Sequence, residues 1–74
     1  MITFEQLKEV LLQGEFEIAQ DNDCGEDILA ELFSDFANAK TLLDLIHIYE
    51  DRGFETYEAN ECIINTMMQL ATLD

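Results

Sequence analysis

Negative charge is the feature that most constrains how this chain folds. Seventeen Asp and Glu residues stand against three Lys and Arg among 74 residues, which gives a formal net charge of −14. Charge of one sign in such excess destabilises a compact state through self-repulsion. A fold must therefore bury enough apolar surface to offset the repulsion, and the 49% hydrophobic content supplies material for a core. The sequence predicts a single acidic domain, residues 1–74, rather than a disordered chain.

The same imbalance indicates which partners suit the chain. Its three cations, Lys8, Lys40 and Arg52, cannot neutralise a phosphate backbone, so direct binding of nucleic acid is excluded. Anionic membranes repel such a chain, and no apolar run reaches the roughly 20 residues of a membrane span. The charge instead predicts a basic protein surface as the partner, such as that of a nucleic-acid-binding protein or nuclease.

The N-terminal residues and the cysteines predict where the protein acts. The first residues lack the basic and apolar regions of an export signal, so we expect a cytoplasmic protein, in the host cytoplasm if it is phage-encoded. Reduced thiols are therefore expected at Cys24 and Cys62, rather than a disulfide.

Capping patterns and glycines divide the first third of the chain into helix-sized pieces, and proline is absent. Thr3 and Gln6 form the capping-box pattern of a first helix, which we expect to end at Gly14. Residues 15–19 alternate polar and apolar side chains. A turn or short helix is favoured there over a short extended segment, because no second strand is evident for pairing.

Three more helices are expected downstream. Asp23 is a candidate N-cap for the second, Thr41 opens the third, and Gly53 ends it. The last helix is expected from about Thr56 to Leu70. The predicted fold is therefore all-α, a compact bundle of four to five short helices. The residues expected to face its core include Phe4, Leu7, Val10, Leu11, Ile28, Leu29, Leu32, Phe33, Phe36, Leu42, Leu45, Ile46 and Tyr49.

Three acidic residues form a row on the second predicted helix. Asp27, Glu31 and Asp35 follow one another at i, i+4 and i+8, about 6 Å apart along the axis. Like charges at this spacing cost stability, and the spacing is of the order of that between neighbouring backbone phosphates. A solvated face is the commoner explanation of one such row, and a phosphate-like ladder is the functional one. The other predicted helices repeat the acidic bias, which favours the ladder.

The ladder interpretation predicts a set of partner-binding residues. The first choices are Asp27, Glu31 and Asp35, and the second choices are Asp44, Glu50, Asp51, Glu55 and Glu58.

No catalytic, metal or cofactor site is predicted. Residues 21–26 fail the ligand pattern of an EF-hand loop. His47 is the single histidine, too few for an ordinary transition-metal site. Ser34 is the single serine and lacks a nucleophile-elbow motif. We therefore expect an interaction protein rather than an enzyme.

These observations predict a small acidic protein that binds and inhibits a basic, nucleic-acid-binding protein, as a phage-type anti-restriction, anti-CRISPR or other DNA-mimic inhibitor does. The alternative is an immunity protein or antitoxin that neutralises a basic toxin through the aromatic anchors Tyr49, Phe54 and Tyr57. The apolar Met67/Met68 face of the last helix is a candidate homodimer surface.

Overall fold

Four helices make up the described part of the chain. The computed structural model describes residues 2–72, and no strand occurs among them. The helices are α1 (Phe4–Asp21), α2 (Glu26–Asn38), α3 (Leu42–Asp51) and α4 (Thr56–Thr72). The predicted all-α fold is confirmed.

Capping boxes start α1 and α3; the sequence predicts the first box and the start of α3 at Thr41. The Thr3 hydroxyl accepts a hydrogen bond from the Gln6 N–H at 3.1 Å, and the Gln6 side chain accepts one from the Thr3 N–H at 2.9 Å. Thr41 and Asp44 do the same at α3, at 3.2 and 3.1 Å. Each box satisfies two of the backbone N–H groups that a helix start leaves unpaired.

The expected end of the first helix at Gly14 is wrong. Residues 15–19 are helical, as one of the two favoured alternatives had it, but they continue the first helix and form neither a turn nor an extended segment. The helix α1 continues without a break to Asp21. It ends in a Schellman motif, in which the Cys24 N–H bonds to the Ala19 carbonyl at 3.0 Å and the Asp23 N–H bonds to the Gln20 carbonyl at 3.1 Å. The helix continues because its buried side, which includes Leu11 and Ala19, extends past the glycine.

Asp23 occupies the left-handed position of this motif, with φ of 56°. It therefore belongs to the end of α1. The sequence had suggested Asp23 as the N-cap of α2, and that prediction is wrong. Gly25 is the N-cap of α2, without a side-chain capping bond. Its carbonyl accepts the first backbone bonds, from Ile28 at 3.1 Å and Leu29 at 3.3 Å.

The second Schellman motif ends α3 at Gly53, as predicted. Gly53 has φ of 95°, a conformation that side chains with a Cβ rarely adopt. The Phe54 N–H bonds to the Tyr49 carbonyl at 3.1 Å, and the Gly53 N–H bonds to the Glu50 carbonyl at 3.0 Å. The same turn brings the Phe54 ring edge-on to the Tyr49 ring, with centroids 5.7 Å apart.

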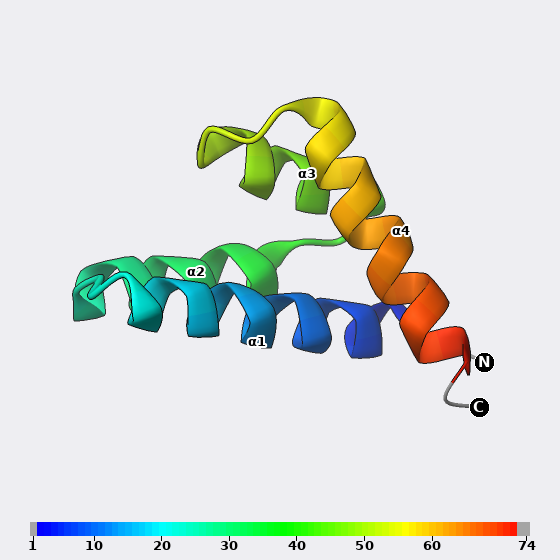
Figure 1. Cartoon of the computed structure of the whole chain (residues 1–74), viewed down its shortest axis with the longest axis horizontal. Helices are drawn as coiled ribbons and strands as arrows, with labels where there is room; N and C mark the ends of the chain where they lie inside the picture. Colours follow the sequence, from blue (N-terminus) through cyan, green and yellow to red (C-terminus); the bar gives the residue numbers. More distant parts are fainter. Residues whose placement is uncertain (1, 73–74) are drawn as a thin grey trace.

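The helices form a hairpin crossed by a second pair (Figure 1). The hairpin consists of α1 and α2, which run antiparallel along the long axis of the molecule. The helix α4 packs against α1 and α3, and α3 contacts α2 less extensively. The start of α1 and the end of α4 lie at the same end of the molecule (Figure 1). The radius of gyration is 12.1 Å, close to the value of about 11 Å expected for a compact chain of this length.

One apolar core lies among the four helices. Its most deeply buried large side chains are Leu32, Phe36, Leu45 and Tyr49, with Leu7, Leu11, Ile48, Ala59 and Ile63 around them. Four residues expected to face the core are exposed instead: Val10, Ile28, Phe33 and Leu42. Phe33 is 55% exposed and lies edge-on to Phe16 of α1, at 5.1 Å between centroids. Short helices bury a narrow stripe, so apolar residues at its margins stay at the surface.

Gly14 provides a test of the continuous α1. It lies in the helix interior, and a Cβ built there meets no atom within 4 Å. Gly14→Ala should therefore raise the free energy of unfolding by roughly 0.5–1 kcal/mol, because alanine loses less backbone entropy. Urea unfolding followed by circular dichroism measures the change. The matched variant Gly53→Ala should lower it by about 1 kcal/mol or more, because of its positive φ. A loss of stability in Gly14→Ala would contradict the helix.

Candidate functional site

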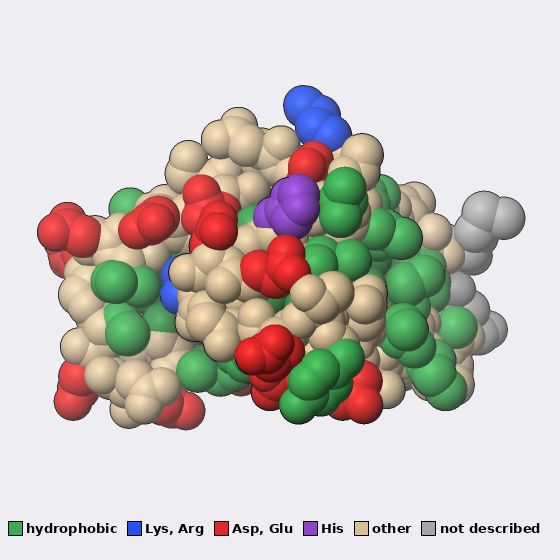
Figure 2. Space-filling view, turned by 90° about the horizontal axis from the view of Figure 1, so that it is seen from above, with side chains coloured by type: hydrophobic (Ala, Val, Ile, Leu, Met, Phe, Trp, Pro, Cys, Tyr) green, Lys and Arg blue, Asp and Glu red, His purple; other side chains and the backbone are tan. Residues whose placement is uncertain are grey.

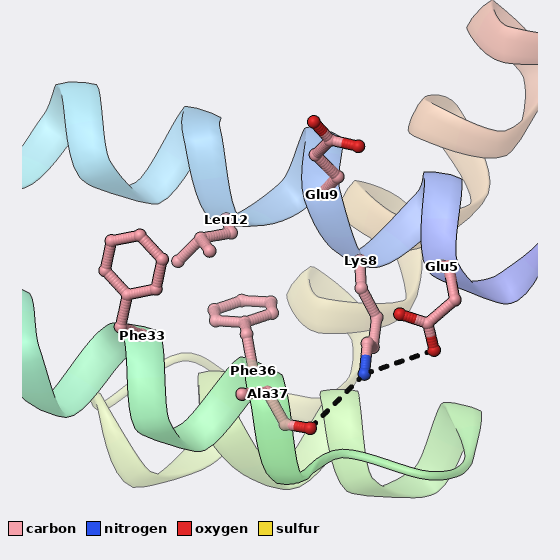
Figure 3. Close-up of a pocket in the computed structure, with 7 residues that line it drawn as sticks. All are labelled: Glu5, Lys8, Glu9, Leu12, Phe33, Phe36 and Ala37. Carbon is pink, nitrogen blue, oxygen red and sulfur yellow. Dashed lines mark hydrogen bonds and ion pairs between the residues drawn. The ribbon is translucent and has the colours of Figure 1, made fainter.

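The acidic side chains lie at the surface while one of the three cations is buried. All acidic residues among 2–72 except Glu15 are at least partly exposed. Lys8 is buried, and its Nζ donates to the Ala39 carbonyl at 3.1 Å and the Ala37 carbonyl at 3.5 Å. It also forms an ion pair with Glu5 at 3.5 Å (Figure 3). The Lys8 ammonium group thus binds the carbonyls at the end of α2. Because this cation is buried, the surface is more acidic than the composition suggests.

The predicted row on α2 is exposed throughout its length. Asp27, Glu31 and Asp35 are all exposed, and none makes a side-chain hydrogen bond or ion pair within residues 2–72. Glu31 and Asp35 line a hollow of about 350 Å³ between α2 and the end of α3. Asp51 lines the same hollow from α3, so the structure joins it to the row. We call this the α2–α3 acidic hollow; its lining is Ile28, Glu31, Asp35, Ile48, Asp51 and Arg52.

Three of the second-choice residues hold helix ends together. The Asp44 carboxylate accepts bonds from the N–H of Lys40 at 2.8 Å and of Thr41 at 3.1 Å. These bonds, the Lys40 one foremost, hold the pKa of the Asp44 carboxyl below its ordinary value. Glu58 accepts from the Glu55 N–H at 2.9 Å at the start of α4.

Glu50 has a similar structural use, since its carboxylate accepts a bond from the Thr56 hydroxyl across the α3–α4 turn. Glu55 and Asp51 differ from these three, because their exposed carboxylates make no such bond within the described chain. Of the eight predicted partner-binding residues, the freest carboxylates are therefore those of Asp27, Glu31, Asp35, Asp51 and Glu55.

A second hollow lies between α1 and α2 and is mostly apolar (Figure 3). It has a volume of about 360 Å³. Leu12 and Phe33 point toward one another across it, Phe36 lies beside them, and Glu9 points away from α2. Lys8 closes its other end through the bonds described above.

A third hollow, which we call the Glu15 hollow, combines acidic and aromatic side chains. It has a volume of about 350 Å³ and lies among α1, the α3–α4 turn and α4. Its lining consists of Glu15, Ile18, Tyr49, Phe54, Glu58, Glu61, Cys62 and Asn65. A smaller hollow of about 150 Å³ adjoins it, sharing Glu15, Ile18 and Phe54 and including Arg52.

Burial perturbs two ionisable groups beside the Glu15 hollow. Loss of solvent raises the pKa of the Glu15 carboxyl above its ordinary value of 4.5, and the charge of Arg52 partly offsets the rise. Burial also raises the pKa of the Tyr49 hydroxyl well above its usual range. The Cys62 thiol, which donates to the Tyr49 hydroxyl at 3.7 Å, and the charge of Glu15 add to that rise.

Sequence reasoning missed Glu15. The signal was its position, four residues after Leu11 and four before Ala19, which places it on the buried side of α1. The assumed helix end at Gly14 hid this pattern.

The aromatic and apolar side chains proposed as partner contacts fall into two groups. Tyr49 is 2% exposed and belongs to the core, so it is unavailable as a partner anchor. Tyr57 and Phe54 are exposed, at 65% and 40%. Ile64, Met67 and Met68 are also exposed on α4, so the Met67/Met68 face stays a predicted dimer surface. Figure 2 shows the largest gathering of hydrophobic side chains at the right end of the molecule, with acidic side chains at the left and centre and smaller hydrophobic groups between them.

Comparison with known protein families, curated proteins and solved structures finds no match to this chain. Across residues 2–72, no helix has both the length and the apolar character needed to cross a bilayer. Within the same residues, no three His, Cys, Asp or Glu side chains come together as metal ligands do.

Replacing Glu15 with glutamine tests its burial. Because its pKa is raised in the folded state, protonated Glu15 favours folding below pH 4.5, and this contribution is lost as the pH rises through the folded-state pKa. Glu15→Gln, neutral at every pH, should therefore be more stable than the wild type at pH 7 and close to it below pH 4.

Urea unfolding at both pH values measures this difference. Glu17→Gln is the matched control, because it removes one charge from an exposed position of the same helix. It should change stability less than Glu15→Gln at pH 7. A Glu15→Gln protein less stable than the wild type at pH 7 would show that the carboxylate is favourably paired.

Proposed function

We propose that the protein binds and inhibits a basic, nucleic-acid-binding protein by occupying the groove that DNA or RNA would fill. A phage-type anti-restriction or anti-CRISPR inhibitor acts in this way, and a cytoplasmic location fits such a target. The single observation that carries the proposal is the exposed row of Asp27, Glu31 and Asp35, which meets Asp51 at the α2–α3 acidic hollow.

The arrangement of these carboxylates supports recognition of a groove rather than of one basic residue. They lie on two helices held by a common core, so their spacing is fixed before the partner arrives. None of the four makes an internal hydrogen bond or ion pair within residues 2–72 that a partner would have to break. Lys and Arg side chains that line a phosphate-binding groove would find fixed negative charges in place of phosphates.

The distribution of charge also favours rapid association. A strongly acidic surface steers a basic partner from a distance and raises the association rate more than the final affinity. Arg52 is the cation among the residues that line the α2–α3 acidic hollow, and it limits the local potential. Asp27 does not line that hollow and extends the negative row by one turn toward the start of α2.

An immunity protein or antitoxin is the second candidate. The exposed Tyr57, in the first turn of α4 next to Glu58 and three residues after the exposed Phe54, favours it. A protein of this kind uses the same electrostatics with a narrower interface, centred on aromatic anchors.

Competition with DNA tests the mimicry. The purified protein should displace labelled duplex DNA from a basic nuclease that it inhibits, chosen from a panel of restriction and CRISPR nucleases. Its affinity for that nuclease should fall by roughly a hundredfold or more between 50 and 200 mM salt, because several charge contacts are screened together. Binding that leaves the DNA in place, or that is indifferent to salt, would overturn the proposal.

Two charge reversals locate the binding surface. Glu31→Lys should weaken nuclease binding by roughly tenfold or more, because it places a cation against the basic groove. Glu17→Lys makes the same change in net charge on an exposed part of α1 and should have a much smaller effect. Equal losses of nuclease affinity in the two variants would mean that binding depends only on the net charge of the protein. A large loss in Tyr57→Ala beside a small one in Glu31→Lys would favour the immunity-protein candidate.

A further inference from the structure

Glu15 is a buried carboxylate without a partner. Its side chain is 7% exposed, and it makes no hydrogen bond or ion pair within residues 2–72. Every fully enclosed side-chain nitrogen or oxygen in the described chain has a hydrogen-bond partner. The Glu15 oxygens are therefore not enclosed, and the openings beside them are the two adjoining hollows that this residue lines, of which the Glu15 hollow is the larger.

Keeping such a group is costly for folding. Removing a carboxylate from water without a compensating bond destabilises the folded state, and glutamine would fill the same space without charge. Repulsion among the acidic residues already lowers the stability of the folded state, and a desolvated negative charge lowers it further. Groups of this kind are typical of binding and active sites, where the ligand supplies the missing partner.

The surroundings of Glu15 define the chemistry of that partner. Glu58 and Glu61 add two carboxylates from α4 to the same hollow. The Phe54 ring, 40% exposed, forms an aromatic wall backed by the edge-on Tyr49 ring, and Ile18 contributes apolar surface. A cation with a flat, weakly hydrated, partly apolar group fits this combination of negative charge and aromatic surface.

Arginine meets these requirements better than lysine does. Its guanidinium group is planar, donates two parallel hydrogen bonds to a carboxylate and stacks on aromatic rings, whereas an ammonium group is compact and strongly hydrated. A volume of about 350 Å³ is at the lower end of the range of ligand pockets, which suits one inserted side chain. We propose that the Glu15 hollow receives the guanidinium group of an arginine side chain from a partner protein.

The chain's own Arg52 does not already fill this site. It lines the smaller adjoining hollow and the α2–α3 acidic hollow, but not the Glu15 hollow. Its charge acts on Glu15, yet no ion pair within 4 Å joins the two. A partner's guanidinium in the Glu15 hollow would therefore add a contact rather than replace one.

A titration with small arginine analogues tests the proposal directly. The probe is N-acetyl-arginine methylamide, added to the isotopically labelled protein and followed by NMR. We expect saturable shifts confined to residues around Glu15, Phe54 and Glu61. The uncharged citrulline analogue should not bind, and the lysine analogue should bind at least fivefold more weakly, because it lacks the planar pair of donors.

Two variants of equal charge identify the residue responsible. Glu15→Gln should weaken binding of the arginine analogue by roughly tenfold, the loss expected when one charge-assisted contact is removed. Glu17→Gln, at an exposed position of the same helix that does not line the hollow, should leave it unchanged. Because Glu15→Gln is expected to be the more stable protein at pH 7, unfolding cannot explain its loss of binding.

Shifts spread over all the acidic residues, with equal affinity for the arginine and lysine analogues, would overturn the proposal. So would unchanged binding in Glu15→Gln. The experiment needs no nuclease, so its failure leaves the proposed inhibition of a nucleic-acid-binding protein standing. Failure of the DNA competition would likewise leave the arginine site standing.

Discussion

The fold depends on the ring of Tyr49, through which three helices share one core. Tyr49 lies on α3, meets Phe36 of α2 edge-on at 6.2 Å between centroids, and accepts a hydrogen bond from Cys62 of α4. Its backbone carbonyl accepts the bonds that turn the chain at Gly53 and bring Phe54 against the same ring. In a chain with a net charge of −14, apolar contacts of this kind must offset the mutual repulsion of the surface carboxylates.

The shortage of cations also decides how the helices end. None of the four helices has a basic residue in its last turn, so none pairs its terminal carbonyls with a cation of its own. Backbone bonds in two Schellman motifs satisfy the carbonyls at the ends of α1 and α3, and the buried Lys8 serves the end of α2. Carboxylates serve the opposite ends, where Asp44 and Glu58 accept backbone N–H bonds. Part of the acidic excess is therefore structural.

Structural features that depend on residues close in the sequence were predictable, and features that depend on the packing of distant residues were not. The capping box at Thr3 and the helix start at Thr41 were predicted because the bonds that form them join residues three apart in the sequence. Gly14 misled because the same residue type serves in a helix interior and at a helix end, and only the packing of the whole helix distinguishes them. The meeting of Asp51 with Glu31 and Asp35 was unpredictable, because it depends on how α3 lies on α2.

The two kinds of acidic site differ in what salt does to them. Exposed carboxylates such as Asp27 act over a distance and are screened at physiological ionic strength, so they contribute chiefly to the rate of encounter. A desolvated carboxylate such as Glu15 is screened much less, and a wrong partner leaves it unpaired. If both proposals hold, the exposed row accounts for the salt-dependent part of the affinity. The Glu15 hollow would then account for the part of the affinity that remains in high salt. It would also select among basic partners, which the exposed row by itself attracts equally.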